Sequence, residues 1–251
     1  MRNGNLFWGA VLILLGVLMA FNLTEYFWPI ALIVLGGWII WGAYMRGNAR
    51  NQSVSVDLQG AREVSLRIGH GAGQLRVGAG ATVGKAIEGE CSEGVTVNSR
   101  VAGDRLEVRL GADPVSFPFV GTRGLDWALR LSKDVPFALE LETGANQSIV
   151  DLRDLRVTSL HLQTGASSTE VTLPASGQLT VHVELGAAEA KIRVPEGVAG
   201  RIRSQSGLAE ININQSRFPY SNGIYESPDF GTSANRFDMN IEAGVGKVSV
   251  F

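Results

Sequence analysis

A glycine-centred heptapeptide recurs at a fixed spacing through the second half of this chain, and this repeat constrains the fold more than any other feature. LELETGA at 139–145 is followed by LHLQTGA at 160–166 and VHVELGA at 181–187. Successive copies lie 21 residues apart, and a later copy arrives after 37 residues, one period plus an insertion of 16. The glycines of the motif are Gly71, Gly144, Gly165, Gly186, Gly207 and Gly244. Fixed periods of this length indicate a stacked architecture.

Within each copy, apolar and polar residues alternate on both sides of the glycine. Leu139 and Leu141 precede Gly144, and Val150 and Leu152 resume the pattern after it. Period-two alternation indicates a strand with one buried face, and the glycine supplies the positive φ or the tight backbone that a corner requires. One coil cannot bury its apolar face alone, so successive coils must stack. We therefore predict a mainly β fold, a β-solenoid of about 21-residue coils that resembles a single-stranded β-helix.

This architecture predicts that equivalent residues line up in rows along the stack, about 4.8 Å apart. Leu141, Leu162 and Val183 should form a single interior row. Two outward rows should contain Glu142, Gln163, Glu184, Gln205 and Glu242, and Glu140, His161, His182, Arg203 and Asn240. The alternation of Glu with Gln in the first outward row keeps like charges apart, which suits a stacked sheet.

Two segments depart from the period within the β domain, which we expect to span residues 52–251. Residues 95–136 are irregular, with a hairpin turn predicted at Ala102–Arg105. An insertion at about 215–235 is rich in proline and aromatic residues and is expected to cap an open edge of the stack. Alternatively, its aromatic side chains form a surface for a partner, as the outward histidines could. That candidate surface comprises His161, His182, Phe218, Tyr220, Tyr225 and Phe230.

The first 50 residues differ from the rest because they consist mainly of two uncharged apolar runs, 6–23 and 26–44. Each run has the length that a membrane-spanning helix needs, and only Thr24 and Glu25 separate them. We predict a two-helix transmembrane hairpin over residues 1–50. A cleavable signal peptide is the alternative, but the second apolar run follows the first at once.

Side chains within this segment predict how it sits in a bilayer. Arginines flank the hairpin while the turn carries only a glutamate, so the positive-inside rule puts both termini and the β domain in the cytoplasm. Tryptophans favour the headgroup level, and glycines allow close helix packing, either between the two spans or across a dimer. The predicted anchor residues are Trp8, Gly9, Gly16, Trp28, Gly36, Trp38 and Trp41.

Several stretches resemble a known bacterial family. LRLSKDVP at 129–136, followed by FALELETGA and LHLQTGA, resembles the toast-rack domain of LiaF-like membrane proteins. RNGNLFWGAVLILLGVLMAF and FWPIALIVLGGWII are similar to the two-span segment of the same family. The resemblance implies a multi-pass protein of the bacterial inner membrane that is not an enzyme and assists cell-envelope stress signalling, with a membrane partner such as a sensor kinase. The long insertion has no match in the family pattern.

No constellation in the sequence predicts catalysis, a metal site or a cofactor. His161 and His182 are one coil apart, with Glu140 one coil further, but Zn²⁺ needs a compact set of three or four ligands and the arginine of the same row is expected beside them. The glycine run around His70 lacks the Gly-Lys-Ser/Thr of a phosphate loop and is interpreted as a corner. Cys91 has acidic sequence neighbours that would raise the pKa of its thiol.

Charge and cysteine content narrow the classes of partner. A net charge of −2 with dispersed basic residues disfavours a nucleic-acid partner, and a single cysteine excludes an intrachain disulfide. We therefore expect a lipid bilayer and a membrane protein as partners, with no small-molecule substrate. The expected function is a membrane-anchored regulator or scaffold. The alternatives are a structural solenoid that forms homo-oligomers through its terminal strand at 247–251, and a surface β-helix that binds or cleaves carbohydrate.

Overall fold

The computed structural model describes residues 52–92, 95–112 and 126–251, together with Gly36. The chain divides into two compact units, Met1–Asn48 and Ala49–Phe251. The elements described below all belong to the second unit, which contains the repeat.

The predicted membrane hairpin falls outside the described residues, apart from Gly36. This applies to both spans, 6–23 and 26–44, and to six of the predicted anchor residues: Trp8, Gly9, Gly16, Trp28, Trp38 and Trp41. Among the residues that are described, no helix has the length and apolar character needed to cross a membrane.

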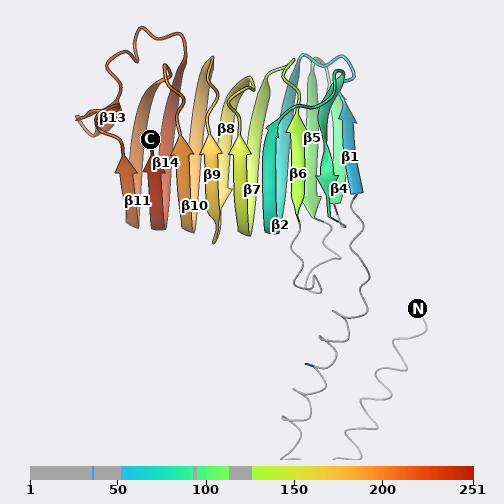
Figure 1. Cartoon of the computed structure of the whole chain (residues 1–251), viewed down its shortest axis with the longest axis horizontal. Coiled ribbons are helices and arrows are strands. Elements are labelled where there is room, and N and C mark those ends of the chain that lie inside the picture. The colour runs from blue at the N-terminus through green and yellow to red at the C-terminus, as the bar shows by residue number, and fades with distance from the viewer. Residues whose placement is uncertain (1–35, 37–51, 93–94, 113–125) are drawn as a thin grey trace, which may run out of the picture. The chain divides into compact units, whose positions relative to one another are not determined.

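Fourteen strands form the described part of the second unit and join into one hydrogen-bonded sheet that folds over itself (Figure 1). The strands are β1 (Gln52–Asp57), β2 (Glu63–Ala79), β3 (Lys85–Cys91), β4 (Val95–Ala102), β5 (Arg105–Ala112), β6 (Trp127–Leu131), β7 (Phe137–Asp151), β8 (Val157–Thr164), β9 (Ser168–Thr172), β10 (Gln178–Arg193), β11 (Ala199–Ile213), β12 (Tyr220–Ser221), β13 (Ile224–Glu226) and β14 (Arg236–Val250).

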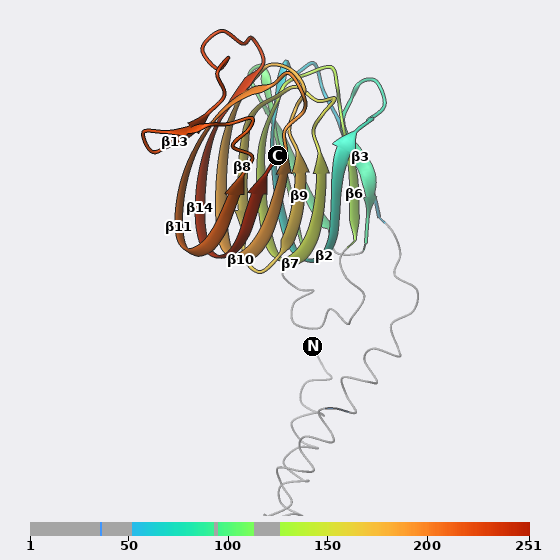
Figure 2. The ribbon, with the colours of Figure 1, turned by 60° about the vertical axis from the view of Figure 1, so that its left-hand side comes forward.

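The long strands are rungs that bend at the glycine corner, so each contributes to both faces of the stack (Figure 2). Before its corner β2 pairs with β5, and after its corner it pairs with β6. β7 pairs with β2 in parallel both before and after the corner. β8 and β9 are the two halves of the next rung, and both pair with β7 and β10. This is the mainly β, stacked architecture that the repeat predicts.

The interior row predicted from the period is confirmed by the register. Leu141 pairs with Leu162, and Leu162 pairs with Val183, and all three side chains are fully buried. The row extends to Ile68 on one side and to Ile241 on the other. Stacked aliphatic side chains therefore form the core between the two faces, and their burial is the main stabilising contribution of each added rung.

The rungs do not stack in chain order, which corrects the prediction that each coil lies on the one before it. β14 inserts between β10 and β11, so β11 lies at the end of the rungs although it precedes β14 in the sequence. Residues 247–250 are consequently paired on both sides, to β10 and to β11. The terminal strand is therefore not the open edge that self-assembly was expected to use, and β11 takes that place.

The sequence suggests two reasons for the corner glycines, a positive φ or a tight backbone. The structure favours the second, because neighbouring rungs approach closely at the corner. None of these six glycines is among the described residues with positive φ. A Cβ built on Gly144 would lie 2.4 Å from the carbonyl oxygen of Gly71, and one on Gly244 would lie 2.8 Å from that of Gly186. At Gly71, where the column begins, a Cβ would meet nothing within 4 Å. Each later glycine makes room for the backbone of the rung before it.

The described part of the irregular segment is more regular than expected. β4 and β5 form a hairpin in which Ala102 faces Arg105 across the predicted turn, and Gly103 in that turn has a φ of +62°. β6 is antiparallel to β3 and parallel to β2. Residues 113–125, which contain Pro114 and Pro118, lie outside the described residues.

The insertion forms a short hairpin, β12 and β13, at the edge of β11. On β11, only Arg201 and Ile202 pair with β13, so the expected cap covers just the start of that edge. Phe218 is buried against Phe237, with ring centroids 5.9 Å apart, and Phe230 is buried as well. These two phenylalanines are core residues, which corrects their assignment to a partner surface.

Candidate functional site

Outward-facing side chains on the rung halves before the corner form an ordered array, which we term the outer ladder. In parallel, in-register strands, equivalent side chains lie side by side on the same face. In spatial order one row of the outer ladder is Arg67, Glu140, His161, His182, Asn240 and Arg203, and the other is Gly69, Glu142, Gln163, Glu184, Glu242 and Gln205.

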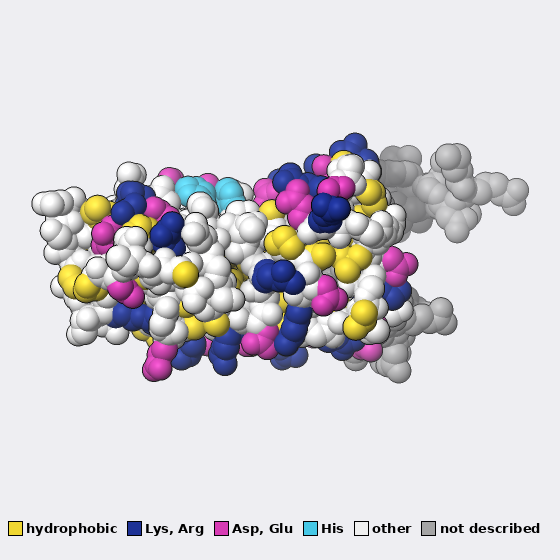
Figure 3. Space-filling view, turned by 90° about the horizontal axis from the view of Figure 1, so that it is seen from above, with side chains coloured by type: hydrophobic (Ala, Val, Ile, Leu, Met, Phe, Trp, Pro, Cys, Tyr) yellow, Lys and Arg dark blue, Asp and Glu magenta, His cyan; other side chains and the backbone are white. Residues whose placement is uncertain are grey.

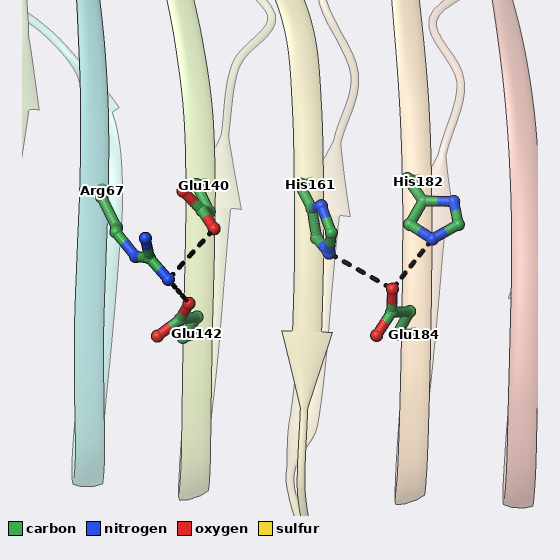
Figure 4. Close-up of polar contacts among 6 residues, drawn as sticks. All are labelled: Arg67, Glu140, Glu142, His161, His182 and Glu184. Atoms are coloured by element: carbon green, nitrogen blue, oxygen red, sulfur yellow. Dashed lines mark hydrogen bonds and ion pairs between the residues drawn. The ribbon is translucent and has the colours of Figure 1, made fainter.

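Arg67 pairs with both glutamates of β7 in the outer ladder (Figure 4). Its Nη2 lies 3.4 Å from Glu140 Oε1 and hydrogen-bonds to Glu142 Oε1. The hydrogen bond to Glu142 is the largest contribution that raises the pKa of Arg67, followed by the charge of Glu140. Glu140 is thus paired with an arginine, not with the neighbouring histidine.

His161 and His182 converge on one carboxylate (Figure 4). His182 Nε2 lies 2.9 Å from Glu184 Oε1, and His161 Nε2 lies 3.5 Å from the same oxygen. The two rings lie edge to face, with centroids 5.0 Å apart. All three side chains are between 33% and 40% exposed. The period predicts the histidine pair, but not Glu184, whose approach depends on side-chain direction along one strand.

The insertion of β14 changes the neighbours that the sequence predicts for this cluster. Asn240 lies beside His182, and Arg203 lies one strand further, where its Nη1 donates a hydrogen bond to Asp238 at 2.8 Å. In the second row Glu242 lies beside Glu184. This corrects the predicted alternation of Glu and Gln, because the rungs that meet here are not consecutive in sequence.

A shallow hollow of about 560 Å³ lies beside the outer ladder at the glycine corner. Glu184, Gln205 and Glu242 line it, and Gly186 and Gly244 form part of its floor. Figure 3 shows the histidine pair on a surface where basic and acidic side chains are interspersed. Small-molecule sites are usually enclosed and mostly apolar, so an open polar hollow is better suited to contact with a macromolecular surface.

The other chemically reactive residues lie inside the stack. His70 is buried at the corner, 2.9 Å from Asn146 Nδ2 through its Nδ1 and edge to face with Trp127. This agrees with its interpretation as a corner residue. Cys91 is a buried free thiol, and burial raises its pKa to about 11. The raised pKa was expected, but its cause is burial and not neighbouring acids.

The edge of β11 is a feature that the repeat alone does not predict. In the described part of the chain, no strand pairs with residues 203–213 on the side away from β14. Leu208 on this edge is 85% exposed, and its neighbour Val245 on β14 is 52% exposed. The unpaired N–H and C=O groups of such an edge can pair with an extended segment of another chain.

Of the two tyrosines of the insertion, Tyr220 is exposed and Tyr225 is half-buried against the core. Their rings face each other across the β12–β13 hairpin with centroids 4.7 Å apart, and Tyr220 is 57% exposed. Of the predicted surface residues, these two tyrosines therefore lie beside the β11 edge, while His161 and His182 lie on the outer ladder.

Comparison with known proteins gives one family match and a structural likeness. The family described as the N-terminal domain of toast_rack, DUF2154, matches residues 45–193. A search of curated proteins finds no match. A putative cell adhesion protein from Clostridium sporogenes has a similar structure, with a TM-score of 0.72 and 19% identity over 81% of this chain and 99% of that one. This likeness concerns the fold.

Two further solved structures align with weaker scores. A putative adhesin from Bacteroides fragilis gives a TM-score of 0.20 and 7% identity, over 80% of this chain and 97% of that one. A putative adhesin from Parabacteroides merdae gives a TM-score of 0.23 and 10% identity, over 82% and 98% of the two chains.

Proposed function

Because this chain belongs to the family of N-terminal toast_rack domains, we propose that it is a non-enzymatic scaffold or regulator that is anchored in a bacterial inner membrane and acts through protein contacts. The apolar runs at 6–23 and 26–44 would provide the anchor. The stacked β domain would carry the contact surface, as the resemblance to LiaF-like accessory proteins of envelope stress signalling implies.

The open edge of β11 is the observation that supports this proposal most directly. Residues 203–213 offer backbone N–H and C=O groups with no strand beside them in the described part of the chain. An extended segment of a partner can add to such an edge as a further strand, and its backbone supplies the affinity while pockets for its side chains supply specificity. Leu208 and Val245 provide an apolar contact at the same edge.

A site-specific crosslinking experiment tests the contact. A photo-crosslinking amino acid at Leu208 should give a discrete adduct with a second membrane protein in intact cells, because this side chain lies on the proposed edge. The same amino acid at Val83, which is 89% exposed on a distant loop between β2 and β3, is the matched control. Equal adducts from both positions, or none from Leu208, would contradict the proposal.

The orientation of the β domain separates this proposal from an adhesive role. Adhesion, which the name of the C. sporogenes protein suggests for that protein, requires the β domain outside the membrane. A regulator of the kind proposed requires it in the cytoplasm. Alkaline phosphatase, which is active only outside the cytoplasm, should be inactive when fused after residue 251, whereas a fluorescent reporter fused there should be active. Phosphatase activity would favour adhesion, or binding or cleavage of surface carbohydrate.

Self-assembly is the second candidate, and the same edge of β11 favours it over the terminal strand. Two copies could pair edge to edge through residues 203–213. Sedimentation of the detergent-solubilised chain should then show concentration-dependent association that Leu208→Lys removes. A monomer at all concentrations would exclude self-assembly and leave the contact with another protein.

A further inference from the structure

We propose that His161, His182 and Glu184 form a binding site for one divalent transition-metal ion such as Zn²⁺. The ligand atoms of these three side chains lie within 4.8 Å of one another. This metal chemistry is independent of the protein contact proposed above, and it is a property of the outer ladder.

The geometry is close to what tetrahedral zinc needs. With ligand bonds of about 2.0–2.1 Å, two ligand atoms on a tetrahedral Zn²⁺ are about 3.3 Å apart. Glu184 Oε1 lies 2.9 Å from His182 Nε2 and 3.5 Å from His161 Nε2, distances that bracket this value. The third distance, between the Nε2 atoms of the two histidines, can be adjusted by rotation of side chains that are about a third or more exposed.

The backbone holds the three ligands in place. His161 and His182 are register partners on the parallel strands β8 and β10. Glu184 is two residues beyond His182 on the same strand, so both point to the same face. Ligands on paired strands are better fixed than ligands on loops, which lowers the cost of organising the site. Two imidazoles and a carboxylate suit Zn²⁺ and leave a fourth position for water or a partner's side chain.

Neighbouring charges favour a cation at this place. The nearest arginines on either side of the cluster in this row are occupied, since Arg67 pairs with Glu140 and Glu142 and Arg203 pairs with Asp238. Glu242 lies beside Glu184 in the next strand and adds a second negative charge to the cluster. The insertion of β14 is what puts Asn240 and Glu242 here in place of Arg203 and Gln205.

Zinc titration of the full-length chain in detergent, purified without a polyhistidine tag, tests the site. The background is low, because the chain has three histidines and one cysteine, and both His70 and Cys91 are buried. Competition against a chromophoric chelator should give saturable uptake of one Zn²⁺. His161→Asn, His182→Asn and Glu184→Gln should each weaken uptake at least about tenfold. Glu140→Gln, which changes the carboxylate that Arg67 holds, is the matched control and should stay within about twofold.

Thermal unfolding gives a second measurement that does not depend on the chelator. Zinc should raise the melting temperature of the wild-type chain and of Glu140→Gln, because only the folded ladder brings the ligands together, and should not raise that of Glu184→Gln. Uptake no stronger than that of the His161→Asn/His182→Asn double variant would overturn the site. Wild-type affinity in Glu184→Gln, or equal weakening in Glu140→Gln, would also overturn it.

Discussion

The column of corner glycines explains why one residue type recurs at one position of the repeat. In each rung after the first, a Cβ would approach the carbonyl oxygen of the preceding glycine in the stack, from 2.4 Å at Gly144 to 3.3 Å at Gly165. Since a backbone oxygen cannot rotate away as a side chain can, a methyl group at the tightest of these positions forces the rungs apart. The requirement is steric, so it should depend on the neighbour and vanish where no neighbour exists.

Gly144→Ala should therefore lower the free energy of unfolding by about 2–3 kcal/mol, because its Cβ would lie 2.4 Å from the carbonyl oxygen of Gly71. Gly71→Ala is the matched control, since it is the same substitution at the same corner with nothing within 4 Å. Its effect should stay within about 0.5 kcal/mol. Denaturant unfolding measures both, and equal losses would contradict a role through close approach.

Cys91 gives a prediction about pH. Burial raises the pKa of its thiol to about 11 in the folded chain, against about 8.5 when unfolded. The protonated thiol therefore contributes stability that is fully present below about pH 8.5 and is lost as pH rises towards 11. The unfolding free energy of the wild-type chain should fall faster over this range than that of Cys91→Ala. Parallel pH profiles for the two chains would show that the thiol does not contribute.

Strand alternation and period predict most of the fold because they are local properties. The interior row of Leu141, Leu162 and Val183 follows from a spacing of 21 residues, and so does the pairing of His161 with His182. The position of β14 does not follow, because every rung has the same alternation and fits between any two others. The connection at about 215–235 is long enough for the chain to leave β11 and place β14 between β10 and β11. Tertiary packing, and not the repeat, selects this position for β14.

The same reasoning explains what the sequence predicts about the candidate site. It identifies the histidines, but it names Glu140 as the nearest acid and a basic neighbour as an obstacle to metal binding. Arg67 occupies Glu140, and β14 separates Arg203 from His182. Both corrections depend on which strands are neighbours and on side-chain direction, and neither is encoded in a single repeat.

The turn between β10 and β11 is held by one side chain of the insertion. Arg217 donates hydrogen bonds to the carbonyl oxygens of Val194, at 2.6 Å, Val198, at 3.0 Å, and Pro195. Burial lowers the pKa of Arg217, and an arginine guanidinium stays protonated in proteins. These bonds tie the insertion to this turn and give the carbonyl groups of Val194, Pro195 and Val198 a charged donor.

Arg217→Ala should cost about 2 kcal/mol of unfolding free energy, because it leaves these carbonyl groups without a charged donor. Arg217→Lys should restore only part, since an ammonium cannot reproduce the planar fork of the guanidinium. Arg153→Ala, on an exposed turn, serves as the control and should be close to neutral. Denaturant unfolding measures all three, and a loss for Arg153→Ala equal to that for Arg217→Ala would contradict a specific role for the turn.

The insertion of β14 between β10 and β11 makes the carboxyl-terminal strand an internal support of the whole stack. In a sequential solenoid the last coil is an end piece, and its removal shortens the stack while the other coils keep their neighbours. Here β11 has β14 as its only long partner among the described residues, and without β14 the strand β10 would keep its partners, β8 and β9, on one side only. The cooperativity of the C-terminal half therefore depends on the final strand.

A chain that ends at residue 235 should consequently lose β11 as well as β14. Amide hydrogens of residues 199–213 should then exchange at the rate of unstructured peptide, while those of β2 and β7 keep their protection, because those rungs retain their neighbours. Replacing residues 219–227 by a short glycine-serine linker removes only the β12–β13 hairpin and serves as the control, and it should leave most of β11 protected. Hydrogen exchange by mass spectrometry measures both chains. Retained protection of residues 199–213 in the truncated chain would mean that β11 can stack directly on β10, as the sequential order requires.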